Sequence, residues 1–202
     1  MTIRVLLADD QSLVRGAMAA LLGLEPDIEV VAEVARGDEV VAAVQRFEPD
    51  VCLLDIEMPG LDGIEAAALV TETRPRCRTL MVTTFSRPGY LRRALEAGAS
   101  GFVVKDTPAP ALADAVRRAH AGLRVVDPAL ATESLLDGPN PLTTREREVL
   151  REALTGAPVA SIAATVHLSP GTVRNHLSAA IGKTGASTRG EAARTAEERG
   201  WL

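Results

Sequence analysis

Five short runs of apolar, mostly β-branched residues, each followed by an amphipathic stretch, constrain the fold more than any other feature of the sequence. Strands buried on both faces are almost continuously apolar, and parallel strands need a crossover that is usually a helix. The alternation therefore predicts a doubly wound α/β domain with a five-stranded parallel sheet. The expected strands are Arg4–Ala8, Glu29–Ala35, Val51–Leu54, Thr79–Thr83 and Gly101–Val104. The expected helices are Ser12–Leu22, Asp38–Phe47, Gly63–Arg74, Pro88–Ala97 and Pro108–Ala121.

A wholly helical pattern follows the breaker cluster Gly138-Pro139-Asn140-Pro141, which ends a segment over residues 127–136. Such clusters of glycine, proline and asparagine are typical of linkers. We therefore expect an α/β domain over residues 1–121, a linker over 122–141 and a small all-α domain over 142–202. The helices expected in the second domain are Thr143–Leu154, Val159–Val166, Ser169–Lys183 and Thr188–Arg199.

The composition indicates a globular chain with a packed core, because 47% of its 202 residues are apolar and 24% are charged. The longest apolar runs have strand length, far below the ~20 residues of a membrane helix, and no leader pattern opens the sequence. We therefore expect a cytoplasmic protein without membrane contact. Cys52 and Cys77 indicate neither a disulfide nor a metal site, so we expect two plain thiols.

The net charge of −5 argues against nucleic-acid binding until it is divided by region. Residues 1–140 carry 14 Lys and Arg against 21 Asp and Glu, a balance of −7. Residues 141–202 carry 8 against 6, a balance of +2. The acidic and basic functions are therefore separated along the chain, and the C-terminal part suits a nucleic-acid partner.

Three acidic residues stand where expected strands end. Asp9 and Asp10 follow the first strand, and Asp55 follows the third. Ligands of open parallel sheets bind beyond the carboxyl ends of the strands, so we expect these carboxylates to lie together. A single acid at a strand end usually caps the next helix. Three clustered acids, however, raise one another's pKa values unless a cation neutralises them.

A magnesium ion would satisfy this cluster, because Mg²⁺ takes carboxylate ligands together with phosphate oxygens and waters. We expect Asp10 and Asp55 to be ligands, with Asp9 in the first or the next coordination sphere. The fourth strand ends at Thr83, and Lys105 follows the fifth. Since it faces three acids, Lys105 is expected to act as a counter-ion that also holds a phosphoryl oxygen.

These residues stand in motifs that resemble the receiver domain of two-component response regulators, over residues 3–121. The motifs are Leu7-Ala8-Asp9-Asp10, Leu54-Asp55-Ile56-Glu57-Met58-Pro59-Gly60-Leu61-Asp62-Gly63, Val82-Thr83-Thr84 and Lys105-Asp106. The resemblance implies a flavodoxin-like fold in which Asp55 is the phosphoacceptor. A sensor histidine kinase would be the partner, and its phosphohistidine would be attacked to form an acyl phosphate.

The same resemblance assigns roles around the phosphoacceptor. The backbone carbonyl of Glu57 would complete the Mg²⁺ shell, Thr83 would hydrogen-bond the phosphoryl group, and the rotamer of Phe102 would follow Thr83 as a switch. Core packing is the alternative role for Phe102, and the two roles are compatible. Glu57 and Phe85 are expected to influence the lifetime of the acyl phosphate.

The segment from Ser169 predicts a helix start, with Ser169 as N-cap and Pro170 at the first helical position. In the helix that follows, apolar residues recur at helical spacing, which leaves a polar face containing Arg174 and Asn175. A polar face is usually only solvated. Here the short helix and turn expected before it complete a helix-turn-helix, whose second member enters the major groove of DNA.

The C-terminal part resembles the LuxR/FixJ-type DNA-binding domain over residues 142–202. The motifs are Leu142-Thr143-Thr144-Arg145-Glu146-Arg147-Glu148-Val149-Leu150, Ile162-Ala163, Leu168-Ser169, Thr172-Val173-Arg174-Asn175-His176-Leu177, Lys183 and Gly200-Trp201-Leu202. The residues expected to contact DNA are Thr172, Arg174, Asn175, Ser178 and Lys183. Among them Lys183 is expected to hold a phosphate, whereas Glu146 is implied to be structural. His176 could be either a packing residue or a DNA contact.

The last helix is implied to be the dimer helix of this family, with Ala192, Ala193 and Ala196 at its interface. A two-fold dimer would explain binding to inverted half-sites about one helical turn apart. Small alanines make a weak interface, so we expect the isolated DNA-binding domain to dimerise poorly and the whole chain to form a homodimer when phosphorylated.

The sequence thus predicts a response regulator of the NarL/FixJ type that binds promoter DNA, with RNA polymerase as a further partner. It would not be an enzyme beyond phosphorylating and dephosphorylating itself. One alternative is a Mg²⁺-dependent phosphohydrolase with Asp55 as nucleophile and Glu57 as acid. Another is a DNA binder whose receiver no longer responds to phosphate.

Overall fold

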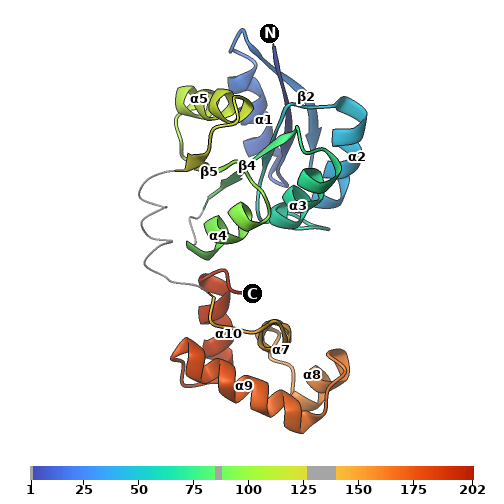
Figure 1. Ribbon diagram of the computed structural model, residues 1–202, viewed down its shortest axis with the longest axis vertical. Helices are drawn as coiled ribbons and strands as arrows, with labels where there is room; N and C mark the ends of the chain where they lie inside the picture. The colour runs from blue at the N-terminus through green and yellow to red at the C-terminus, as the bar shows by residue number, and fades with distance from the viewer. Residues whose placement is uncertain (1, 85–87, 127–139) are drawn as a thin grey trace. The chain divides into compact units, whose positions relative to one another are not determined.

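The computed structural model describes residues 2–84, 88–126 and 140–202. These form two units, an N-terminal α/β unit and a C-terminal helical unit (Figure 1). Among these residues, no helix combines the length and the apolar character needed to cross a bilayer. Most of the predicted linker, residues 127–139, and Phe85 lie outside the described residues.

A parallel sheet in the order β2-β1-β3-β4-β5-β6 forms the centre of the N-terminal unit. Its strands are β1 (Ile3–Ala8), β2 (Ile28–Val34), β3 (Val51–Leu54), β4 (Arg78–Thr83), β5 (Gly101–Val104) and β6 (Val125–Val126). The five predicted strands agree within one residue at each end. The expected number of five strands was wrong, because the sheet has a sixth strand, β6, which lies within the predicted linker. Two residues are too short for a strand pattern, and β6 forms only by pairing with the edge of β5.

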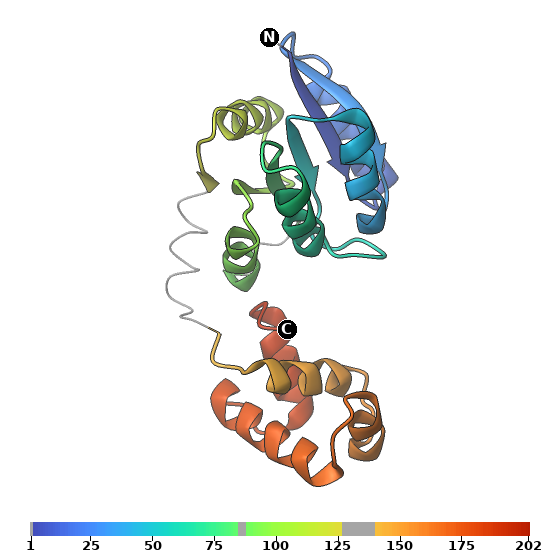
Figure 2. The ribbon, with the colours of Figure 1, turned by 45° about the vertical axis from the view of Figure 1, so that its right-hand side comes forward.

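Helices cover both faces of the sheet, as a doubly wound fold requires. They are α1 (Ser12–Leu22), α2 (Gly37–Phe47), α3 (Gly63–Thr73), α4 (Pro88–Glu96) and α5 (Ala109–His120). Figures 1 and 2 show α1 and α5 on one face and α2, α3 and α4 on the other. On the first face, Met18 of α1 and Val116 of α5 pack against alternate strand residues such as Leu7 and Leu53.

The loop between β3 and α3 is held at both ends. Asp62 caps α3 by accepting a hydrogen bond from the backbone N–H of Glu65, whose side chain in turn accepts one from Asp62 N–H. Gly63 then passes so close to β3 that an added Cβ would lie 1.8 Å from the carbonyl oxygen of Asp55. Only glycine fits there, and this contact fixes the chain that leaves the third strand.

The C-terminal unit consists of α7 (Thr144–Leu154), α8 (Val159–Thr165), α9 (Pro170–Thr184) and α10 (Arg189–Glu198). Its core contains apolar residues from all four helices, together with Trp201 near the chain end. Asn140 connects the two ends of the unit, because its amide donates to the carbonyl oxygen of Trp201 at 2.8 Å and accepts from Leu142 N–H at 2.9 Å. All four predicted helices are present, with ends that differ by at most one residue.

Candidate functional site

The predicted acidic cluster forms at the carboxyl edge of the sheet. Asp9 and Asp10 directly follow β1, and Asp55 follows β3, which pairs with β1. One carboxylate oxygen from each of the three residues lies within 4.8 Å of the others. Asp9 and Asp55 are buried, whereas Asp10 is exposed. The sheet therefore brings together three acids that are separated by up to 46 positions in the sequence.

Lys105 completes the pocket from the end of β5. Its ammonium nitrogen lies 2.7 Å from Asp9 Oδ2 and 3.0 Å from Asp55 Oδ2. The other oxygen of Asp55 accepts a hydrogen bond from Ile56 N–H at 2.8 Å. Burial raises the pKa of Asp55, and the neighbouring Asp9 adds to this, although Lys105 opposes the rise. Burial acts to lower the pKa of Lys105, but both carboxylates hold it above its ordinary value.

The donor set of this pocket is compatible with a divalent metal ion. Three carboxylates face a single ammonium group, which leaves an excess of negative charge at the edge of the sheet. Hard oxygen ligands of this kind are preferred by Mg²⁺, which binds through few carboxylates and retains waters. Exposed Asp10 gives an ion access from solvent.

Three further residues with predicted roles lie in β4, in β5 and after β3. Thr83 is the last residue of β4 and is buried, and its carbonyl oxygen accepts a hydrogen bond from Lys105 N–H at 2.8 Å. Phe102 lies in β5 opposite Met81 and is only 1% exposed, so it is a core residue here. Glu57 is exposed two residues beyond Asp55. The phosphate-linked roles of Thr83, Phe102 and Glu57 remain predictions.

In the C-terminal unit, α9 has the two faces that the sequence predicts. Val173 and Leu177 are buried in the core, while Arg174, Asn175 and Ser178 are exposed. The helix starts as expected, because Ser169 Oγ accepts a hydrogen bond from the backbone N–H of residue 172 at 3.1 Å. Thr172 is partly buried, and its hydroxyl lies 2.8 Å from that same Oγ.

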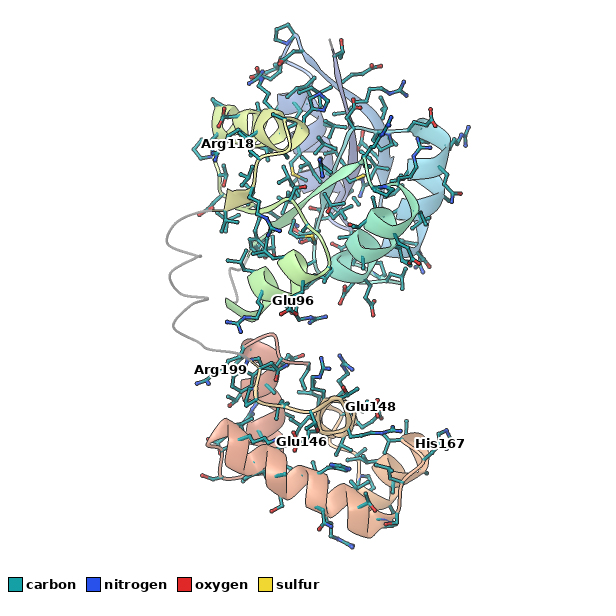
Figure 3. All side chains as sticks on the ribbon, viewed as in Figure 1. Glu96, Arg118, Glu146, Glu148, His167 and Arg199 are labelled. Atoms are coloured by element: carbon teal, nitrogen blue, oxygen red, sulfur yellow. The ribbon has the colours of Figure 1, made fainter. Side chains whose placement is uncertain are left out.

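The turn between α8 and α9 is tight. His167 in this turn has a φ of 54°, in the left-handed region that non-glycine residues seldom adopt. Leu168 N–H donates back to the carbonyl oxygen of Ala163 at 2.9 Å, which closes the turn. Figure 3 labels His167 at this end of the unit. A short helix, a tight turn and a longer helix with a polar outer face form a helix-turn-helix.

Comparison with protein families identifies both units. A model described as "Response regulator receiver domain" matches residues 5–117, more than half of the chain. A model described as "Bacterial regulatory proteins, luxR family" matches residues 140–196. The chain is a response regulator with a LuxR-type DNA-binding domain.

Relatives of this response regulator match it over its whole length. "Uncharacterized transcriptional regulatory protein YvfU" of Bacillus subtilis (strain 168) is 43% identical over 200 residues, covering 99% of this chain and 100% of its own. "Transcriptional regulatory protein DesR" of the same strain is 42% identical, covering 99% of both chains. Among solved structures, "Response Regulator ChrA in Heme-Sensing Two Component System" is 32% identical, with a TM-score of 0.60 and coverage of 100% and 99%.

An arginine that sequence reasoning missed supports the acidic pocket of the response regulator. Arg15, on the first turn of α1, donates from Nη1 to the backbone carbonyl oxygen of Asp9. Its Nε lies 3.5 Å from Glu33 Oε2 on β2. Arg15 therefore connects α1, β2 and the loop that carries Asp9. Its position six residues beyond Asp9 was the only available sequence signal, and that spacing alone does not reveal the contact.

Lys183 of the response regulator has a partner within its own domain. Its ammonium lies 2.9 and 2.7 Å from the two carboxylate oxygens of Glu146, which is 4% exposed. Glu146 also accepts from Thr143 N–H at 2.7 Å in a capping box at the start of α7. Burial acts to raise the pKa of Glu146, but Lys183 and Thr143 together lower it. The implied structural role of Glu146 agrees with these contacts, and the DNA-phosphate role of Lys183 stays a prediction.

The predicted interface on α10 needs a correction. Ala192, Ala193 and Ala196 are fully buried in the core of the domain, where α10 packs against α7 and α9. Their spacing is that of a core-facing stripe, and their small size permits close approach of the helices. They are therefore not exposed interface residues in this structure. The outer face of α10 carries charged residues instead, including Arg194 and Glu197.

Proposed function

We propose that a sensor histidine kinase phosphorylates this regulator on Asp55 and that the phosphorylated chain forms a homodimer on promoter DNA. The cluster of Asp9, Asp10 and Asp55, with Lys105 bonded to two of them, is the observation that carries the proposal. Such a pocket suits phosphoryl transfer, which depends on positioning and charge neutralisation more than on covalent chemistry by the protein. We place this activity in the cytoplasm.

In the proposed transfer, a carboxylate oxygen of Asp55 bonds to phosphorus as the bond to the donor's histidine nitrogen breaks, and the nitrogen keeps the electron pair. Asp9, Asp10, Asp55 and the backbone carbonyl of Glu57 would hold Mg²⁺, which neutralises phosphoryl oxygens when bound. Lys105 supplies the fixed positive charge, and its ion pairs already direct it at Asp55. The same pocket would allow self-phosphorylation from small donors and later self-dephosphorylation.

The phosphoryl group carries up to two negative charges and offers three acceptor oxygens. Thr83 would be drawn towards them, and Phe102 would respond to the movement of Thr83. This change biases the regulator towards a dimer that brings two copies of α9 to adjacent half-sites. Arg174, Asn175, Ser178 and Thr172 are the proposed DNA contacts. Lys183 can join them by sharing its ammonium between Glu146 and a phosphate, and RNA polymerase is a proposed further partner.

The first test is phosphorylation of the full chain by acetyl phosphate with Mg²⁺, followed by intact mass and sedimentation. We expect one phosphoryl group per chain and a shift towards dimer in the wild type, and neither in Asp55→Asn. Asp114→Asn is the matched control, because this exposed acid on α5 lies outside the pocket. Phosphorylation of Asp55→Asn to the wild-type extent would refute the phosphoacceptor assignment. Turnover of small phosphate esters would instead favour a phosphohydrolase.

The second test concerns the recognition helix. We expect Arg174→Ala to weaken binding to a site selected from random DNA by about fivefold or more, as expected for loss of a base or phosphate contact worth about 1–3 kcal/mol. Arg151→Ala removes another exposed arginine, from α7, and should leave binding unchanged. Equal losses in the two variants would show that net positive charge, rather than the α9 surface, determines the affinity.

A further inference from the structure

The two cysteines of the chain, which the sequence presents as unrelated thiols, meet in the N-terminal unit. Cys52 lies in β3, and Cys77 lies in the turn that precedes β4, 25 positions later. Their sulfur atoms are 3.4 Å apart, and both side chains are buried. A disulfide requires a sulfur–sulfur distance of about 2.05 Å, so a small adjustment of the two side chains would allow a bond.

The turn holds Cys77 in this position by backbone hydrogen bonds on both sides. Cys77 N–H donates to the carbonyl oxygen of Arg74 at 2.9 Å, and Arg78 N–H donates to that of Asp50 at 2.8 Å. The second bond begins the pairing of β4 with β3, the strand that contains Cys52. The proximity of the sulfurs is therefore imposed by the sheet and the turn.

Only one of the two thiols has access to solvent. Cys77 is 7% exposed and lines an open pocket of about 580 Å³, together with Arg74, Arg76 and Asp50. Cys52 is 0% exposed and is absent from the pocket lining. A small reagent in this pocket would therefore meet Cys77 first, with Cys52 directly behind it.

The pKa values of the two thiols also differ, and the more exposed thiol has the lower pKa. The hydrogen bond with Cys52 lowers the pKa of Cys77, and Arg74 adds to this although burial and Asp50 oppose it. The hydrogen bond with Cys77 and burial both raise the pKa of Cys52. The thiolate is the reactive form of cysteine, so Cys77 has the character of an attacking thiol and Cys52 that of a resolving thiol.

We propose that Cys52 and Cys77 form a hydroperoxide-sensitive dithiol that closes to an intramolecular disulfide. The Cys77 sulfur attacks one peroxide oxygen, the O–O bond breaks, and water or an alcohol leaves, so that Cys77 becomes a sulfenic acid. The Cys52 sulfur then attacks the Cys77 sulfur, the S–O bond breaks, and a second water leaves with the proton of the Cys52 thiol. The two sulfurs lose two electrons in total, and the peroxide gains them.

The bond would fasten β3 to the turn before β4 at a point three residues upstream of Asp55. It would close a loop that contains the whole of α3. Closing such a loop restricts the unfolded chain, so the oxidised N-terminal unit should unfold at a higher denaturant concentration than the reduced one. This site does not depend on the proposed phosphorylation of Asp55.

The test treats the full-length wild type with hydrogen peroxide and then alkylates it under denaturing conditions. We expect both thiols to escape alkylation, the intact mass to fall by about 2 Da for the two hydrogens lost, and a proteolytic peptide to link Cys52 to Cys77 within one chain. A reductant should restore full alkylation. This measurement uses the unmodified sequence, so its outcome does not depend on the folding of a variant.

Two variants test the order of attack. In Cys52→Ala, a sulfenic-acid-specific diketone should label Cys77 about tenfold more than in the wild type, because no thiol remains to resolve the intermediate. In Cys77→Ala, Cys52 should stay unlabelled because it is buried. Full alkylation of both thiols after peroxide treatment would overturn the proposal, as would a disulfide between two chains or sulfinic acid on Cys77 beside a free Cys52.

Discussion

Replacing Glu146 should destabilise the DNA-binding domain far more than replacing Glu148, two residues further along α7. Glu146 has a 6% exposed side chain and lies between α7 and α9, where it binds Thr143 N–H and Lys183 (Figure 3). Glu148 forms an ion pair with exposed Arg145, three residues earlier on the same helix. The two glutamates therefore share a helix and a charge but differ in burial and in partners.

The expected magnitude follows from the bonds that are lost. A hydrogen bond between a charged group and a backbone N–H is worth about 1.5–3 kcal/mol. The ion pair with Lys183, whose side chain is 35% exposed, adds about 1 kcal/mol or less after screening. Glu146→Ala should thus cost about 1.5–4 kcal/mol of unfolding free energy. Glu148→Ala should cost about 0.5 kcal/mol or less.

The single tryptophan makes this measurable in the full chain. Trp201 is buried in the core of the same domain, so its fluorescence during urea unfolding reports on that domain alone. Glu146→Gln keeps an oxygen for Thr143 N–H and should lose less than Glu146→Ala. Equal unfolding midpoints for Glu146→Ala and Glu148→Ala would refute the reasoning.

The same pair has a defined pH dependence. The pKa of Glu146 is lowered in the folded domain, so its charged form contributes fully above the unfolded-state value of about 4.3. That contribution is lost as the pH falls through the lower folded-state pKa. The stability difference between wild type and Glu146→Gln should therefore shrink on acidification. A difference that grows below pH ~4 would contradict the assigned sign.

Three further outcomes are expected in the N-terminal unit. Gly63→Ala should cost about 1–3 kcal/mol and slow phosphorylation, because the new Cβ would collide with the Asp55 carbonyl. Gly16→Ala, whose added Cβ meets no atom within 4 Å, should instead stabilise α1 by about 0.5–1 kcal/mol. Equal unfolding midpoints for the Gly63→Ala and Gly16→Ala variants would argue against both of these predictions. Lys105→Met should raise the pKa of Asp55 further, because the Lys105 ammonium is the main group that lowers this pKa. Carboxyl NMR titration checks this, and an unchanged Asp55 would show that Lys105 does not act on it.

The sequence predicted those elements whose pattern is longer than a few residues. Five strands and nine helices were predicted with ends close to the observed ones, because their apolar periodicity depends on burial along the whole element. The acidic cluster was predictable for a topological reason, since parallel strands bring residues from distant loops to one edge. β6 was not predicted because its two residues, Val125 and Val126, are too few to show a periodic pattern.

Contacts that depend on side-chain direction were not predictable from the sequence. Arg15 could equally have pointed into solvent, and the sulfurs of Cys52 and Cys77 meet only because of the turn before β4. The spacing of Ala192, Ala193 and Ala196 on α10 fits either a dimer interface or a core. In the structure these residues pack in the core of the domain with α7 and α9. The capping box that joins Thr143 to Glu146 is a case where the three-residue spacing could have revealed the contact earlier.

The bonds of Asn140 have a consequence for how this domain can be cut from the chain or modified at its end. The side-chain amide of Asn140 hydrogen-bonds both Leu142 N–H and the Trp201 carbonyl oxygen. A fragment that starts at Leu142 therefore loses these two bonds between its N-terminal and C-terminal ends. A fragment that starts at Asn140 keeps them. A change at Trp201 acts on the same bonds as a change at Asn140, so the domain keeps its two ends joined only when both residues are retained.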